Sequence, residues 1–254
     1  MSHTKGQLFM HRISIVRYDH NDPRLGRHVH HDSRSLDHEF LPRKAKPKRK
    51  NTFWDSAIAP LNQGDLGSCT GNATAQWLNT NFANAVRQAT NKGKALTEKN
   101  AVAIYSLGTR LDDQPGQYPP TDTGCDGLSV AKAAVQLGYL DRYSHTFSFS
   151  ALQAALETTP VIVGTLWTNT MFKPRNGLVK VGRLTQSNIA GGHEYLACGI
   201  DFTTEVIIFR NSWGDEDAWA GCKPGGYFAI SFADFQKLLA EQGDATILHG
   251  KVTA

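Results

Sequence analysis

Apolar and polar positions follow two different spacings along the chain. Up to about residue 137 apolar residues recur at helical spacing, which predicts helices over residues 70–90, 97–110 and 127–137. Ser148 or Ser150 can cap a further helix that ends near residue 157. Short runs rich in Val, Ile, Phe and Tyr then predict strands at 161–167, 195–200, 206–209 and 227–230, followed by a closing helix at 231–241. A helical half followed by a strand half predicts an α+β fold with its cleft between the two.

The first fifty residues differ from the rest of the chain in composition. They hold 12 Lys and Arg against 5 Asp and Glu, whereas the remainder holds 15 against 18, and seven of the ten histidines also lie there. Residues 8–18 can form a short strand, but two prolines among six basic residues exclude a helix at 42–50. We therefore expect a basic arm and linker over residues 1–50 and a folded body over residues 51–254. The arm is either a solubilising linker or a contact for nucleic acid, an anionic polymer or an acidic partner.

The chain carries no signal for a membrane span or for classical secretion. No apolar stretch approaches the roughly 18 residues that a span requires, and no apolar core precedes a small-residue cleavage site near the N-terminus. We expect cytoplasmic synthesis and no membrane contact, with release or association with a virion left open. The four cysteines do not have the spacing of a small disulfide scaffold, and a pairing of Cys125 with Cys222 is left open.

One cysteine is placed where a fold can activate it. Cys69 follows a glycine-rich turn and stands at the start of the first predicted helix. Unpaired backbone N–H groups and the helix dipole at such a position lower the pKa of a thiol, and the thiolate is the form that attacks. Gln63, six residues upstream, can fold back and donate a hydrogen bond beside the sulfur.

A base and a group to orient it come from the strand half. His193 precedes the predicted strand at 195–200, and Asn211 follows the next strand at 206–209. The head of one strand and the tail of the next can lie side by side, so the two side chains can touch. A thiol nucleophile needs a base within hydrogen-bond reach and a third group that holds the base in place.

These motifs together resemble the papain-like cysteine peptidases. The pattern of Gln63, then 67–69 as Gly-Ser-Cys, then Gly192-His193, then 211–214 as Asn-Ser-Trp-Gly occurs in that family's order. The resemblance implies a two-lobed papain-like fold, with an antiparallel sheet in its second half. It implies that Asn211 orients His193.

The resemblance also assigns supporting roles. It implies that Gln63 stabilises the negatively charged oxygen of the reaction intermediate. It implies that Trp213 shields the hydrogen bond between His193 and Asn211 from water, and that Gly192 directly precedes the catalytic base. It places Ser68, Asp126 and Gly127 along the substrate. Leu66 stands where secreted relatives have a cysteine, so their usual disulfide cannot form here.

The function that follows is hydrolysis of peptide bonds by a cysteine endopeptidase through an acyl-enzyme, with a peptide or protein as substrate and with no metal or organic cofactor. One alternative is a cell-wall enzyme, an endopeptidase or amidase that cuts peptidoglycan cross-peptides. The other is a papain-fold scaffold without activity whose basic arm binds a partner. The sequence leaves the subsite preference and the oligomeric state open.

Overall fold

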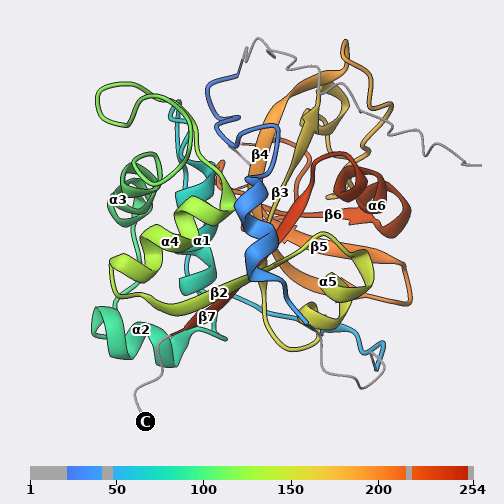
Figure 1. The fold of residues 1–254 in the computed structure, drawn as a ribbon. Coiled ribbons are helices and arrows are strands. Elements are labelled where there is room, and N and C mark those ends of the chain that lie inside the picture. Colours follow the sequence, from blue (N-terminus) through green and yellow to red (C-terminus); the bar gives the residue numbers. More distant parts are fainter. Residues whose placement is uncertain (1–21, 42–47, 216–218, 251–254) are drawn as a thin grey trace, which may run out of the picture.

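The computed structural model describes residues 22–41, 48–215 and 219–250. Figure 1 shows the helices of the first half gathered on one side of the molecule and most of the sheet, with the later helices, on the other. The strand predicted at 8–18 and most of the basic run at 42–50 lie outside the described residues. The α+β expectation is confirmed.

The helical side is built around α1, which is buried at every position. Its four helices are α1 (Cys69–Leu78), α2 (Asn84–Asn91), α3 (Glu98–Gly108) and α4 (Gly127–Gln136). The single helix predicted over 70–90 is wrong, because the chain breaks between α1 and α2. Asn79 exchanges two hydrogen bonds of 2.8 Å with the backbone of Leu96, and the Thr80 hydroxyl donates to the Trp77 carbonyl. Such side chains compete with the helical ladder.

The other predicted helices begin at side-chain caps. Thr97 and Asn100 form a capping box at the start of α3. Ser148 accepts from the Ala151 N–H ahead of α5 (Phe149–Leu156), and Ser231 accepts from the Asp234 N–H ahead of α6 (Phe232–Ala240). Two short 3₁₀ turns are η1 (Ser33–His38) and η2 (Asn169–Phe172).

The sheet has the strand order β2-β7-β3-β4-β5-β6, and its neighbouring strands pair antiparallel. Its strands are β2 (Leu140–Thr146), β3 (Val161–Thr168), β4 (Ile189–Asp201), β5 (Val206–Arg210), β6 (Tyr227–Ser231) and β7 (Asp244–Gly250), and the short β1 (Thr52–Phe53) pairs with β4. The sequence prediction missed β2 and β7, so α6 does not close the chain. The sequence of β2 is mostly polar, and β7 follows α6, the last element that the pattern predicts.

The sheet separates two apolar cores. Along β3, Val161 and Val163 pack into the core that contains Phe235 of α6, whereas Ile162 packs into the core that contains Trp77 of α1. Side chains alternate between the two faces of a strand, so a strand that lies between two cores is buried on both faces. This explains why β3 is buried at all its positions.

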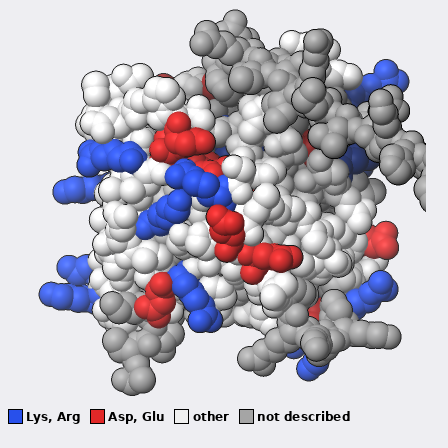
Figure 2. All heavy atoms as spheres, viewed as in Figure 1, with Lys and Arg blue, Asp and Glu red and all other residues white. Residues whose placement is uncertain are grey.

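Part of the predicted arm lies between the two sides of the molecule. We call residues 22–29 the cleft segment; it forms parallel bridges from Gly26 to Gly192 and from Arg27 to Cys125. In Figure 1 the blue chain of residues 22–41 passes between α4 and the sheet. On the face shown in Figure 2, basic and acidic side chains of the described residues are interspersed in small groups. Within the described ranges, no helix is both long and apolar enough to cross a membrane.

Candidate active site

Cys69 is the first residue of α1 and is completely buried. The backbone N–H groups of Glu194, Gly26 and Thr70 lie close enough to the sulfur to lower the pKa of the thiol. Burial raises the pKa of the thiol to about 12, and these N–H groups oppose the rise only in part. The lowered pKa expected at a helix N-terminus is therefore not found here, because the cleft segment lies against the thiol and excludes water from it.

His193 lies within β4 and is held by the residue that follows β5. Its Nε2 is 2.7 Å from Oδ1 of Asn211, and its other nitrogen, Nδ1, is buried without a hydrogen-bond partner. The indole of Trp213 stacks on the imidazole with the ring centroids 4.7 Å apart. Burial lowers the pKa of His193 to about 4, while the bond to Asn211 acts in the opposite direction. The imidazole is thus neutral, with one nitrogen fixed and the other available.

Gln63 is buried and binds both walls of the cleft. Its Oε1 accepts from the Ser212 hydroxyl at 2.7 Å, which fixes the amide. Its Nε2 donates to the Leu66 carbonyl at 2.7 Å and to the Arg24 carbonyl at 3.1 Å. A peptide carbonyl of the cleft segment therefore already accepts from the amide that the sequence assigns to oxyanion stabilisation.

The three residues expected along the substrate lie at helix starts. Ser68 is the N-cap of α1, and its hydroxyl donates to Oδ1 of Asn72. Asp126 is the N-cap of α4 and accepts from the Ser129 N–H and hydroxyl, both at 2.8 Å. Gly127 opens α4.

Cys125, which the sequence suggested only as a possible disulfide partner, supplies the backbone that pairs with the cleft segment. Its N–H donates to the Gly26 carbonyl at 2.8 Å, and its carbonyl accepts from the His28 N–H at 3.0 Å. The sequence contained a sign of this role. Asp126 is a typical N-cap residue, and the residue before an N-cap lies outside the helix, so its backbone N–H and C=O remain available for other hydrogen bonds. Cys125 is a free thiol, so it makes no disulfide with Cys222.

The segment is fixed from the β4 side as well. The Arg27 N–H donates to the carbonyl of Gly192 at 3.2 Å, immediately before His193. The Arg24 guanidinium lies over the Trp213 ring at 4.3 Å and pairs with Asp22 at 2.6 Å. Backbone hydrogen bonds to Cys125 and Gly192 therefore hold the cleft segment across the thiol, together with the Arg24 guanidinium on the Trp213 indole.

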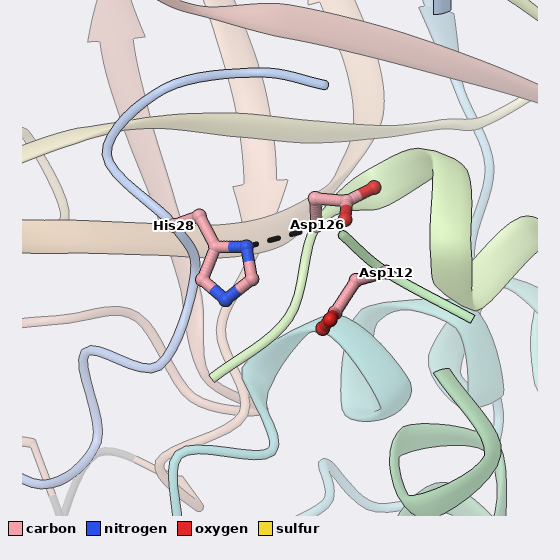
Figure 3. A group of neighbouring side chains, drawn as sticks. All are labelled: His28, Asp112 and Asp126. Carbon is pink, nitrogen blue, oxygen red and sulfur yellow. Dashed lines mark ion pairs between the residues drawn. The ribbon is translucent and has the colours of Figure 1, made fainter. Parts of the chain in front are cut away.

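His28 of the segment also faces two carboxylates, shown in Figure 3. Its Nδ1 is 4.0 Å from Oδ2 of Asp126, and one ligand atom each from His28, Asp112 and Asp126 lie within 4.8 Å of one another. Both Asp126 oxygens already accept from Ser129, and Nε2 of His28 is 3.2 Å from the Thr123 carbonyl. Because these bonds account for the two side chains, we interpret the group as a polar contact that seats the segment.

Comparisons with known proteins agree with this architecture. No protein-family model matches the sequence, and a search of curated proteins finds no match either. Among solved structures the chain is similar to xylellain, a cysteine protease from Xylella fastidiosa, with a TM-score of 0.65 and 16% identity over 90% of this chain and 97% of that one. It is also similar to digestive procathepsin L 3 of Tenebrio molitor (TM-score 0.61, 16% identity, 90% and 77% covered) and to a procathepsin B of Trypanosoma congolense (0.57, 10%, 91% and 88%). The chain has the papain-like fold.

Proposed function

We propose that this chain is a papain-like cysteine peptidase that hydrolyses peptide bonds through an acyl-enzyme. Cys69 attacks the peptide carbonyl, and His193 passes the thiol proton to the leaving amine. Water that is deprotonated by His193 then releases the acid. Gln63 and the Cys69 backbone N–H stabilise the negative charge that develops on the carbonyl oxygen.

The observation that carries this proposal is the state of the His193 ring. Asn211 fixes Nε2, Trp213 covers the ring, and Nδ1 is buried with no partner. The backbone N–H of the next residue along β4, Glu194, acts to lower the pKa of the Cys69 thiol, so the ring and the thiol belong to one site. A thiol nucleophile requires an imidazole nitrogen that is free to take its proton.

The cleft segment provides further support. It is a polypeptide held by backbone bonds to Gly192 and Cys125, with one of its carbonyls on the Gln63 amide. A peptide substrate can use the same groups. With the segment in place, a thiol of raised pKa and an imidazole of lowered pKa stay neutral, so the reactive ion pair does not form. Catalysis requires that the segment leave the cleft.

The test uses full-length chain in which Gly26→Ala weakens the cover, with Gly26→Ala/Cys69→Ser as the matched control. Casein and purified cell walls serve as the two substrates, and an irreversible epoxide inhibitor followed by mass mapping identifies the nucleophile. We expect cleavage of casein and an adduct on Cys69, both lost in the control. Cleavage of cell walls alone would favour the lytic alternative, and no adduct with no cleavage would favour the inactive scaffold.

A further inference from the structure

Arg27 of the cleft segment has an unusual position for a residue of a basic arm. Its side chain is completely buried, although arginine is rarely buried without partners. Nη2 donates to Oδ1 of Asp244 at 2.7 Å and to the Gln242 carbonyl at 2.9 Å, and Nη1 donates to the Val29 carbonyl at 3.3 Å. Nε lies 3.9 Å from Oε2 of Glu194. The guanidinium of Arg27 therefore lies between two acidic side chains, those of Asp244 and Glu194.

The site is built from one row of residues across three strands. Gly164 of β3 pairs with Glu194 of β4 on one side and with Asp244 of β7 on the other. A Cβ on Gly164 would lie 2.3 Å from Nε of Arg27 and 2.6 Å from an oxygen of each acid. The missing side chain therefore provides the space that the guanidinium occupies. Gly127, at the start of α4, covers the same acids, since its Cβ would lie 3.0 Å from Oε1 of Glu194.

The buried acids of this pocket have Arg27 as their cationic partner in the covered form. Glu194 is fully buried, and neither of its carboxyl oxygens has a hydrogen-bond partner. Burial and the neighbouring Asp244 raise the pKa of Glu194, and Arg27, which pairs with Asp244, opposes that rise. Buried acids without a cation are costly. When the segment leaves the cleft, the pocket keeps its acids and loses its positive charge.

The pocket is adjacent to the catalytic base. Glu194 follows His193 on β4, and the backbone of Arg27 bonds to Gly192 on the other side of that histidine. A peptide that uses the Gly192 and Cys125 backbone groups therefore brings a side chain to the mouth of the pocket. An arginine suits it best, because the planar guanidinium can bond two carboxylates and two carbonyls at once.

Resting on the proposed function, we propose that the pocket formed by Gly164, Glu194 and Asp244 is the specificity site of the peptidase and takes an arginine side chain of the substrate. In the covered form Arg27 occupies this site in place of a substrate arginine. A site whose buried polar groups would be left unpaired discriminates strongly against a ligand that lacks the matching group. Citrulline, which is neutral and close to arginine in shape, is the comparison that isolates the charge.

Binding is tested without catalysis in full-length Cys69→Ser/Arg27→Ala. The probe is a fluorescent peptide of residues 22–29 that carries arginine or citrulline at position 27, and fluorescence anisotropy gives its affinity. We expect at least about tenfold tighter binding of the arginine peptide. The additional change Glu194→Gln or Asp244→Asn should bring the two affinities close together, with circular dichroism confirming the fold. If neither variant folds, Gly164→Ala, which fills the pocket, replaces them.

Cleavage is tested in full-length Arg27→Ala with fluorogenic peptides that carry arginine, citrulline or leucine at each of three positions before the scissile bond. We expect arginine at one of these positions to raise kcat/KM at least about tenfold over citrulline. Equal affinities for the two probes, or an arginine preference that survives Glu194→Gln and Asp244→Asn, would overturn the inference. Arginine-selective binding without cleavage of any peptide would instead support the pocket and contradict the proposed peptidase activity. Cleavage of the peptides with no preference for arginine would support the proposed peptidase activity and contradict the arginine site.

Discussion

Gly26→Ala is the most direct way to uncover the thiol. A Cβ at this position would lie 1.9 Å from the Gly67 carbonyl oxygen and 2.4 Å from its Cα. Real contacts are not shorter than 3.0 Å, so the segment has to move by more than about 1 Å away from backbone that cannot rotate aside. Gly26 does not have a positive φ, so the effect comes from this contact and not from backbone strain.

The size of the effect follows from the bonds that the shift breaks. Three backbone hydrogen bonds join the segment to Gly192 and Cys125, at 2.8, 3.0 and 3.2 Å. At about 0.5–1.5 kcal/mol each, losing all three shifts the balance between covered and uncovered forms by about 10-fold to 10³-fold. The pKa of Cys69 then falls from about 12 towards its ordinary value of 9.0. At pH 8 this raises the thiolate fraction by up to about 10³-fold.

Alkylation by iodoacetamide at pH 8, followed by mass mapping, measures this change. We expect Cys69 of the Gly26→Ala protein to be modified at least about tenfold faster than wild type, while the buried Cys198 serves as an internal reference. Gly138→Ala is the control for general destabilisation: the φ of +79° makes this substitution strain the backbone, while a Cβ there meets no neighbour within 4 Å, beyond the end of α4 and away from the segment. Equal rates in Gly26→Ala and wild type would refute the conclusion that the segment protects the thiol.

Three further changes test the site and its surroundings. Gln63→Glu keeps an acceptor for the Ser212 hydroxyl but loses the N–H₂ donor, so kcat in the Gly26→Ala background should fall about 10²–10³-fold. Tm should fall as well, because the carboxylate would face the carbonyls to which Nε2 donates. In the same Gly26→Ala background, water reaches the site and the pKa of His193 returns from about 4 towards its ordinary 6.5. His193→Ala should there lower kcat by about 10²–10⁴-fold and remove the ionisation near neutral pH from the alkylation profile of Cys69; an unchanged profile would exclude His193 as the base. His145 has its pKa lowered to about 4 by burial, so the unfolded chain binds the proton more tightly and stability is lost as pH falls from 6.5 towards 4. In urea titrations, His145→Gln should reduce by about 3 kcal/mol the fall in the free energy of unfolding between pH 6.5 and pH 4. An identical pH dependence in the two proteins would show that His145 does not cause this loss of stability.

Local signals in the sequence were sufficient for most of the helices and for four strands. Thr97, Ser148 and Ser231 cap helices where the pattern predicts them, because capping depends on a few neighbouring residues. The break after α1 was missed, since it depends on Asn79 bonding Leu96, seventeen positions away. The strands β2 and β7 were missed for a similar reason: each is completed by pairing with the other, about a hundred residues apart.

The residue types that the chemistry can use were readable from the sequence: a thiol before a helix, a histidine with an amide partner, and a glutamine upstream. The state of these groups depends on the folded chain. The pKa of Cys69 depends on what excludes water from it, and the covering segment belongs to the arm that was predicted to precede the folded body. The row of Glu194, Gly164 and Asp244 likewise exists only once three strands lie in register. Burial and long-range pairing are properties of the folded chain, and they determine which residues of this protein meet in the cleft.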